Sequence, residues 1–328
     1  MVQLIFRRRN DRSFSIEKVF ETVLPFLREQ IEINIKEVPV RAGGLSSVWK
    51  NIRSLRSLKG DVYHVTGDIH YAVLGFPRRK TVLTIHDCVF MHQSSGLKRW
   101  ILKKIWLDWP VNHARVITTI SEKSKDEIIS FTGCNPDKIK VIPNPVSAAF
   151  SPSPNNTERT QPVILFIGTK INKNLERAID AMKGLAIQLW IVGQVTDQQR
   201  RALEDAKISW QSWVGVSEEK LVQLYQDCDI LLFPSLYEGF GLPVLEAQRV
   251  GRAVITSNIM PMKEVAGKGA CLVDPNNEND IREGLLKVIG DQQYRKSIIQ
   301  EGLKNVIPFE AGTIAQQYRS VYAGLLQE

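Results

Sequence analysis

The chain has 328 residues, 43% of them apolar and 24% charged, which is enough for two domains of ordinary size, each with its own core. No apolar run approaches the ~20 residues that span a bilayer, and the first residues lack a signal-peptide layout, so we expect a cytoplasmic protein. The four cysteines lie far apart, which excludes a disulfide framework and a thiolate metal site.

The positive charge of the chain is concentrated in its first half. The formal net charge is +8, and residues 1–150 carry 24 Lys and Arg against 14 Asp and Glu. A basic first half fits an acidic or membrane-associated acceptor, and ordinary surface solubility explains it equally well. We expect no nucleic-acid partner, because the sequence has no recognisable nucleic-acid-binding motif.

Short apolar runs alternate with amphipathic stretches along the chain, which is typical of a doubly wound α/β fold. A polar, proline-containing stretch at 151–162 predicts a linker between a first domain, 1–150, and a second domain that begins at 163. We therefore predict two Rossmann-like domains that face each other across a cleft. The predicted strands, in chain order, are 2–6, 62–65, 81–85 and 116–120, then 163–167, 189–192, 230–233, 253–256 and 270–273.

The most informative motif is Glu238-Gly-Phe-Gly-Leu-Pro-Val-Leu-Glu246, which follows the apolar run 230–233. Its glycines permit backbone conformations closed to other residues, and its proline suits the first turn of a helix. The unpaired N–H groups and positive dipole end of that helix would hold a diphosphate. Phosphate repels both carboxylates, so Glu246 would accept hydrogen bonds from a ribose diol and Glu238 would reach the transferred sugar. The donor-binding candidates are Gly239, Phe240, Gly241, Leu242 and Glu246, and Glu238 is a catalytic candidate.

A second motif, Gly168-Thr-Lys-Ile-Asn-Lys-Asn174, follows the strand 163–167 and precedes a helical pattern. Lys170 and Lys173 lie in a turn at the mouth of the sheet, where open α/β folds bind ligands. Gly168 is a donor-binding candidate, and the two lysines would neutralise a leaving nucleoside diphosphate. Two solvated lysines in a loop are the alternative, and the neighbouring Glu238–Glu246 motif favours the phosphate-binding role.

With these motifs the sequence resembles the family 4 glycosyltransferases, retaining enzymes of the two-domain GT-B fold, whose donor site carries a Glu-x7-Glu motif of this form. The resemblance continues through Gly251-Arg-Ala-Val-Ile-Thr-Ser-Asn258, Glu264-Val-Ala-Gly267 and Val273-Asp-Pro275. In the first half it is thinner and rests on Thr84-Ile-His-Asp87, Ile120-Ser-Glu122 and Val141-Ile-Pro-Asn-Pro-Val146. The family usually places an arginine in the lysine loop; here Lys170 would replace it as a point charge, without a bidentate fork.

The resemblance implies that His86, which follows the strand 81–85, contacts the donor sugar, and an ordinary His-Asp pair in a loop is the alternative. The adjacent Asp87 is a candidate acceptor-side residue. Arg8 and Arg9 are further candidates, because a basic loop would meet an anionic lipid or a phosphate on the acceptor; solvent-exposed charge explains them equally well. The resemblance also implies that the second domain ends at 310 and that the last helix, 311–328, packs back on the first domain.

We expect no metal. Asp227-Cys-Asp229 superficially matches the Asp-x-Asp motif of metal-dependent glycosyltransferases, but it closes a helical pattern and precedes a strand, whereas a metal-bridging pair lies beyond a strand's carboxyl end. The lysines and the helix dipole are available for the diphosphate. The histidines, at 64, 70, 86, 92 and 113, show no metal-ligand spacing.

The segment 97–109 mixes basic and aromatic residues as membrane-surface helices do. On a helical projection its apolar residues share a broad face, but Lys98 falls inside that face. Packing against the sheet is therefore favoured, and peripheral membrane contact is the alternative.

These observations predict a retaining glycosyltransferase that moves a sugar from a nucleoside-diphosphate sugar to a hydroxyl of a carbohydrate or lipid-linked carbohydrate, in cell-surface polysaccharide synthesis. It would act in the cytoplasm or peripherally at the inner face of the membrane. The alternatives are a retaining phosphorylase or synthase of the same fold, and a non-catalytic subunit that binds a nucleotide-sugar. An oxidoreductase is excluded, because no Gly-x-Gly-x-x-Gly follows a predicted strand.

Overall fold

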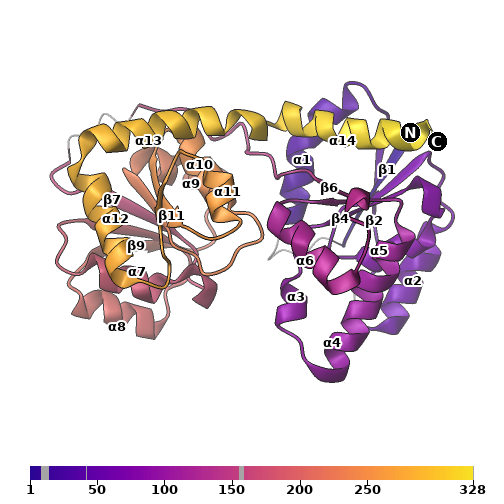
Figure 1. Cartoon of the computed structure of the whole chain (residues 1–328), viewed down its shortest axis with the longest axis horizontal. Helices are drawn as coiled ribbons and strands as arrows, with labels where there is room; N and C mark the ends of the chain where they lie inside the picture. The colour runs from indigo at the N-terminus through magenta and orange to yellow at the C-terminus, as the bar shows by residue number, and fades with distance from the viewer. Residues whose placement is uncertain (9–14, 42, 155–158, 328) are drawn as a thin grey trace. The chain divides into compact units, whose positions relative to one another are not determined.

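The chain divides into two compact units, which are described separately (Figure 1). The first comprises Met1–Pro145 and Ala311–Glu328, and the second is Val146–Glu310. The computed structural model describes residues 1–8, 15–41, 43–154 and 159–327.

The division between the units lies earlier than the sequence predicts. Val146 belongs to the second unit, because its N–H donates to the carbonyl of Phe309 at 2.9 Å. Ser153, inside the expected linker 151–162, is also part of the second unit, where its N–H donates to the carbonyl of Val250 at 3.2 Å. The chain therefore crosses between units after Pro145 rather than at 151–162; residues 155–158 lie outside the described part.

The first unit is built on a six-stranded parallel sheet with the strand order β2-β1-β3-β4-β5-β6. Its strands are β1 (Val2–Phe6), β2 (Ile33–Glu37), β3 (Val62–Val65), β4 (Thr81–Ile85), β5 (Val116–Thr119) and β6 (Ile139–Val141). Its helices are α1 (Ser15–Arg28), α2 (Leu45–Leu55), α3 (Val89–His92), α4 (Gly96–Leu102), α5 (Trp109–His113), α6 (Glu122–Thr132) and α14 (Ala311–Leu326). Shorter helical turns are η1 (His70–Gly75), η2 (Arg78–Lys80), η3 (Lys103–Asp108) and η4 (Pro136–Lys138).

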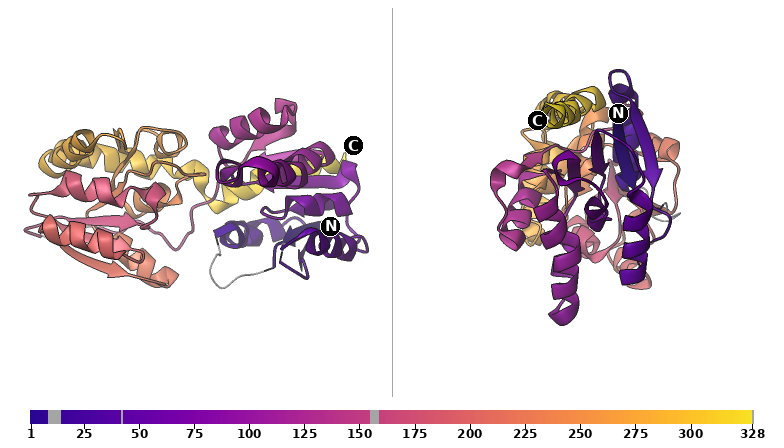
Figure 2. Two further views of the ribbon diagram at one scale, coloured as in Figure 1. Left: turned by 90° about the horizontal axis from the view of Figure 1, so that it is seen from below. Right: turned by 90° about the vertical axis from the view of Figure 1, so that its right-hand side faces the viewer.

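Helix α14 lies along α1, and the two helices cover one face of the first sheet (Figures 1 and 2). A buried histidine fastens α14 to the sheet: His64 on β3 has its Nδ1 2.7 Å from the hydroxyl of Tyr322 and its Nε2 2.7 Å from the hydroxyl of Thr84. The last helix thus packs on the first unit, although it directly follows the second unit in the sequence. The opposite face of the sheet packs against α2, α5 and α6.

The second unit repeats this architecture with the strand order β12-β11-β10-β7-β8-β9, again all parallel. Its strands are β7 (Val163–Ile167), β8 (Gln188–Val192), β9 (Ser209–Trp213), β10 (Ile230–Phe233), β11 (Ala253–Ser257) and β12 (Cys271–Val273). Its helices are α7 (Leu175–Met182), α8 (Asp197–Asp205), α9 (Glu218–Asp227), α10 (Leu242–Val250), α11 (Met262–Ala266), α12 (Glu278–Gly290) and α13 (Gln292–Asn305), with the turns η5 (Ile171–Lys173) and η6 (Ile307–Phe309).

The predicted doubly wound α/β fold is confirmed: both sheets are parallel and covered by helices on their faces. The sequence analysis missed three strands, β2, β6 and β9, and all three are edge strands, whereas the fourth edge strand, β12, was predicted. Edge strands are partly solvated, so they lack the continuous apolar run of a central parallel strand. None of the described helices is both long and apolar enough to cross a bilayer.

Candidate functional site

The Glu238–Glu246 motif forms a loop and a helix start beyond the carboxyl end of β10. Gly241 precedes α10 with φ 111°, a left-handed conformation that strains other residues, and Pro243 lies in the first helical turn. No described side chain caps that turn. The N-terminal end of α10 therefore offers backbone donors and a positive dipole end to an anion, at the sheet edge where open α/β folds bind ligands.

Lys173 and Glu238 come together at this edge. The Nζ of Lys173 lies 2.6 Å from Oε1 of Glu238, and the two side chains are 19% and 15% exposed. The Lys173 ammonium also lies 4.6 Å from the ring centroid of Phe233, the last residue of β10. Such a charge-assisted contact, only partly screened by water, fixes both groups in one position.

Gly168 provides the room that the Lys173 side chain needs. It has φ +89°, and a Cβ placed there would lie 3.0 Å from both Cγ and Cε of Lys173. Any other residue at this position would strain the backbone and displace the lysine stem. The role of Gly168 is therefore to let Lys173 pass and reach Glu238.

Asn174 and Arg177, which the sequence analysis missed, anchor the lysine loop. Asn174 is buried in a left-handed conformation, and its Nδ2 donates to the carbonyls of Pro234, at 3.1 Å, and Pro275, at 2.7 Å. Arg177 donates to Asn174 Oδ1 at 2.6 Å. These bonds fix the loop to the segments that follow β10 and β12. The signal in the sequence was an asparagine immediately before a helix, because Asn tolerates this conformation better than most residues.

A second asparagine joins the lysine loop to the segment that carries Glu238. The Nδ2 of Asn172 donates to the carbonyl of Tyr237 at 3.0 Å, and its carbonyl accepts from Leu236 N at 2.8 Å. One side-chain and one backbone hydrogen bond thus hold the segment of Lys173 against the segment of Glu238.

Glu246 is oriented by a tyrosine that the sequence analysis did not identify. The buried hydroxyl of Tyr225, on α9, donates to Oε2 of Glu246 at 2.7 Å. Burial and the neighbouring Glu246 carboxylate raise the pKa of Tyr225 well above its usual value, so the hydroxyl stays protonated and remains a donor. One carboxylate oxygen is thereby fixed, and the remaining acceptor capacity of Glu246 suits a diol.

The other donor-binding candidates, and Lys170, differ in how far they are exposed to solvent. Phe240 is buried and packs edge to face on Phe309, with ring centroids 6.0 Å apart, so only its backbone is available to a ligand. Gly239 and Leu242 are half-buried at the helix start. Lys170 is exposed, and within the described residues its side chain has no hydrogen bond or ion pair. Lys173 is therefore the lysine that the fold positions.

Asp227 and Asp229 take part in contacts that hold the second unit together. Asp229 Oδ2 accepts from Val163 N at 2.8 Å and lies 3.5 Å from Arg159 Nη1, while Arg159 also donates to the Asp227 carbonyl. These contacts tie the end of α9 to the start of β7, at the amino end of the sheet.

In the first unit, His86 follows β4 and faces a hollow of about 150 Å³ that Asp68, His70 and Asp87 also line. Its Nε2 lies 2.9 Å from the carbonyl of Thr66, so this nitrogen is the donor and Nδ1 is left as the acceptor. Burial lowers the pKa of His86, which keeps the ring neutral at physiological pH. Asp87 Oδ1 accepts from Val89 N at 3.0 Å.

A second hollow, of about 270 Å³, adjoins the first and shares Asp68 and Trp106 with it. Arg8 lines it and donates to the Pro39 carbonyl at 2.6 Å. Arg7, which the sequence analysis did not select, forms two ion pairs: its Nε lies 2.7 Å from Glu17 Oε1, and its Nη1 lies 2.5 Å from Asp68 Oδ2. Arg9 lies outside the described residues.

The remaining histidines are individually hydrogen-bonded or paired. His70 Nδ1 lies 2.7 Å from the Trp106 carbonyl, His113 Nε2 lies 2.9 Å from the Phe76 carbonyl, and His92 Nε2 lies 3.4 Å from Glu127 Oε1. Within the part of the chain that the structure describes, no group of three His, Cys, Asp or Glu side chains is arranged to hold a metal ion.

The segment 97–109 is only partly packed. Its second half contributes the buried Ile105 to the core. Its first half forms α4, which points away from the sheet of the first unit (Figure 1). Large apolar side chains of this half are exposed to solvent. The exposed fractions are 73% for Leu97, 59% for Trp100 and 39% for Ile101. The interpretation that this segment packs against the sheet is therefore wrong for α4.

Several curated glycosyltransferases are similar to this chain in sequence. The curated O-antigen chain mannosyltransferase B of Escherichia coli is 27% identical over 330 residues, which cover 92% of this chain and 82% of the relative. The MMP alpha-(1->4)-mannosyltransferase of Mycolicibacterium hassiacum is 23% identical over 305 residues, covering 83% of this chain and 74% of the relative. The serotype-specific mannosyltransferase WbdA of Escherichia coli is 27% identical over 275 residues, 76% of this chain and 34% of WbdA.

Solved structures share the fold over the whole chain. A glycosyltransferase from Rickettsia africae superposes with a TM-score of 0.77 at 16% identity, covering 100% of this chain and 99% of the other. Anabaena HepE in complex with UDP superposes with a TM-score of 0.78 at 16% identity, covering 99% and 100%. The family described as Glycosyltransferase Family 4 matches residues 4–150, and the family described as Glycosyl transferases group 1 matches residues 149–305. The chain therefore belongs to the family 4 glycosyltransferases of the GT-B fold.

Proposed function

We propose that this glycosyltransferase moves a hexose, with mannose the first candidate, from a nucleoside-diphosphate sugar to a hydroxyl of a carbohydrate or lipid-linked carbohydrate, with retention of configuration. The observation that carries the proposal is the Lys173–Glu238 pair beside the start of α10, which combines a fixed cation, a carboxylate and a helix dipole. The mannosyltransferases among the relatives support the choice of sugar, and the O-antigen enzyme supports a place in polysaccharide synthesis.

In this proposal the leaving diphosphate is stabilised by Lys173 and by the backbone donors at the start of α10. Positive charge that is already in place when the glycosidic bond breaks is the largest electrostatic contribution such a site can make. Lys170, which is exposed, adds a second charge when the diphosphate is bound. We propose that these groups suffice without a metal, so that removing divalent cations with a chelator leaves the transfer rate unchanged.

The two glutamates of the motif bind different hydroxyls. Glu246, with one oxygen fixed by Tyr225, accepts hydrogen bonds from the ribose diol. Glu238 exchanges part of its contact with Lys173 for a hydroxyl of the donor sugar. His86 remains a proposed contact to the donor sugar, through the acceptor nitrogen Nδ1, on the basis of the family resemblance. Retention would follow from front-face attack in which the departing phosphate helps to take the acceptor proton.

A transfer assay with defined donors tests this function. Mannosyl, glucosyl and galactosyl conjugates of UDP and GDP are supplied with mannose oligosaccharide acceptors, and proton NMR records the anomeric configuration of the product. The proposal predicts a product with the anomeric configuration of its donor. An inverted product would overturn retention, phosphorolysis of a disaccharide would favour a phosphorylase, and donor binding without transfer to any acceptor would favour a non-catalytic subunit.

We also propose peripheral membrane contact through α4. Leu97, Trp100 and Ile101 are exposed beside Lys98 and Arg99, and this combination of apolar and basic side chains binds anionic bilayer surfaces. The protein should co-sediment with vesicles containing anionic lipid and much less with neutral vesicles. Replacing Leu97, Trp100 and Ile101 together by Ser should abolish the difference, whereas Leu286→Ser, a similarly exposed apolar residue on α12, should leave it intact. Equal co-sedimentation of all three proteins would refute the contact.

A further inference from the structure

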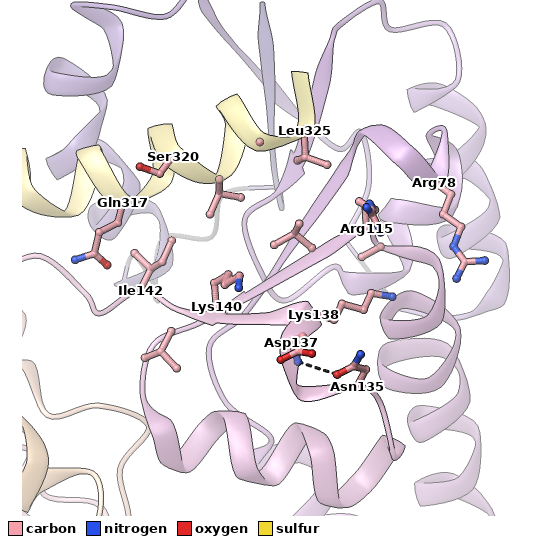
Figure 3. A pocket seen from close by; sticks show the side chains of 15 residues that line it. Arg78, Arg115, Asn135, Asp137, Lys138, Lys140, Ile142, Gln317, Ser320 and Leu325 are labelled. Atoms are coloured by element: carbon pink, nitrogen blue, oxygen red, sulfur yellow. Dashed lines mark hydrogen bonds between the residues drawn. The ribbon is translucent and has the colours of Figure 1, made fainter. Parts of the chain in front are cut away.

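A further hollow of the first unit lies at the opposite end of the sheet from His86. It measures about 750 Å³ and opens between the C-terminal half of α14 and the edge strand β6 (Figure 3). Arg115 immediately precedes β5 and Lys138 precedes β6, so both line it at the amino end of the parallel strands. His86 follows the carboxyl end of β4. The hollow is therefore a separate site, and its volume lies in the range of small-molecule pockets, about 300–1,000 Å³.

One wall of this pocket is strongly basic. Figure 3 shows Arg78, Arg115, Lys138 and Lys140 along it, with Asp137 as the carboxylate among the lining residues. Within the described residues, neither Arg78 nor Lys140 has a hydrogen bond or ion pair from its side chain, and both are exposed. Among the described lining residues, four cations against one carboxylate favour an anion as ligand.

Lys138 shows that these charges repel one another. Its ammonium donates to the carbonyls of Val111 and of Asn112, the latter at 3.3 Å, at the end of α5. Burial lowers the pKa of Lys138, and the nearby Arg78 guanidinium lowers it further. An anion bound between the side chains would relieve this repulsion, which favours binding of a negatively charged group.

The rest of the lining is mostly aliphatic. Ala114, Val116, Val141, Ile142, Val321 and Leu325 contribute to it, together with the neutral polar Asn135, Gln317 and Ser320, and no aromatic side chain is among the described lining residues. An aromatic base would lack a ring to stack on here, whereas a flexible hydrocarbon chain gains free energy with each methylene that it buries. The pocket thus combines a basic wall with a mostly aliphatic one, which suits an anionic amphiphile better than a nucleotide or a free anion.

We propose that this pocket binds a lipid phosphate, with the phosphate against Arg78 and Lys140 and the first methylenes of the chain against Val321 and Leu325. The inference goes beyond the transfer reaction and does not depend on it. It gives the first unit a lipid-binding site on α14, the helix that returns from the second unit.

Titration calorimetry with a short-chain lipid below its micelle concentration tests the proposal. Dihexanoyl phosphatidic acid should bind, whereas glycerol 3-phosphate, which lacks the chains, and dihexanoyl phosphatidylcholine, which is zwitterionic, should each bind at least about tenfold more weakly. If glycerol 3-phosphate binds as tightly as the lipid, or the lipid does not bind, the proposal is wrong.

Three variants locate the binding. Arg78→Ala and Lys140→Ala should each weaken binding about tenfold. Arg79→Ala, in the same helical turn but outside the pocket, should not.

Gly324→Leu should fill the pocket from α14. A Cβ at Gly324 meets no atom within 4 Å, so the helix keeps its place, and leucine is a better helix former than glycine. This variant should melt no lower than the wild type and should lose lipid binding; unchanged binding in Gly324→Leu would place the lipid elsewhere and overturn the inference.

Discussion

Lys173 and Glu238, which are 65 positions apart in the chain, form an ion pair of 2.6 Å that joins the loop after β7 to the loop after β10. Each sequence motif supplies one partner, so the pair shows that the two motifs form one site. The two groups neutralise each other in the ligand-free protein, so under the proposed function a donor would compete for both: its phosphate for the lysine and its hydroxyl for the glutamate.

Replacing either partner of this pair should slow sugar transfer strongly, and this effect should be larger than the effect on the stability of the fold. Lys173→Ala should lower kcat about 100-fold to 1,000-fold, because it removes a preorganised charge from the leaving diphosphate. Glu238→Gln should also lower kcat, and the double variant should lose less than the two single effects combined, because the residues act as a unit. Steady-state kinetics of the four proteins measures this.

The matched control is Lys183→Ala. Lys183 is also paired, with Asp180 Oδ1 at 2.7 Å, but it follows the end of α7 and is 54% exposed. Its loss should change kcat less than about twofold, since an exposed pair contributes little. Equal losses in Lys173→Ala and Lys183→Ala would show that the Lys173 charge has no special role.

Gly168→Ala should impair activity through the lysine rather than through the backbone. The added Cβ would lie 3.0 Å from the Lys173 side chain, in addition to the strain of φ +89°. Gly184→Ala is the control, because Gly184 has a similar φ, +74°, and its Cβ would meet nothing within 4 Å. The left-handed backbone should cost each variant about 1–2 kcal/mol of stability, but only Gly168→Ala should lose most of its transfer activity. Similar activities in the two variants would remove the proposed steric role.

Tyr225→Phe should weaken donor binding without altering chemistry. The change removes the hydrogen bond of 2.7 Å that orients Glu246, so the carboxylate is free to turn away from the ribose. We expect the nucleoside diphosphate to bind about tenfold more weakly, with KM for the donor raised and kcat nearly unchanged. A fall in kcat at constant KM would contradict a ribose-binding role for Glu246.

His64 should make the protein sensitive to acid. Burial lowers the pKa of His64 to about 3, below its usual 6.5, because the ring lies between Thr84 and Tyr322. The unfolded chain therefore binds a proton that the folded chain does not. The stabilising contribution of neutral His64 is complete above pH 6.5 and is lost as the pH falls from about 6.5 towards 3.

This contribution should fall by about 1.4 kcal/mol per pH unit well below pH 6.5. Urea unfolding of the wild type and His64→Gln, at pH values from 7 to 4.5, measures the two slopes. Since other buried histidines remain, the variant should show a shallower dependence on pH, not a flat one. Identical slopes would mean that His64 is not the group responsible.

The sequence predicted the interior of the fold better than its boundaries. Buried strands such as β4 and β10 have uninterrupted apolar runs, and every residue of both is buried. The edge strand β9, Ser-Trp-Gln-Ser-Trp, has no such run and was missed. The sequence analysis placed the crossing between units too late because it relied on the proline and serine of the polar stretch 151–162. The chain changes unit after Pro145, where the backbone N–H of Val146 bonds to the second unit.

At the candidate site, the sequence analysis predicted the charged residues that could contact a ligand. It missed the residues that hold these charged side chains or their loops in position. Lys173, Glu238 and Glu246 stand in recognisable spacing. Tyr225 and Asn174 act through contacts across the fold, 21 positions away in one case and 101 in another. A local pattern, the asparagine before a helix, marks Asn174 alone, and neither contact can be inferred from it. Positioning residues of this kind become visible only when the strands are assembled.

Nucleotide binding tests most directly whether Lys173, Glu246 and the start of α10 form the donor site. Thermal stabilisation is measured with UDP, GDP and ADP and their sugar conjugates in the presence of a chelator, for the wild type, Glu246→Ala and Lys173→Ala. One nucleotide family should stabilise the wild type selectively, and both variants should lose most of the shift. An undiminished shift in both variants, or no shift with any nucleotide, would contradict the assignment of the donor site to Lys173, Glu246 and the start of α10.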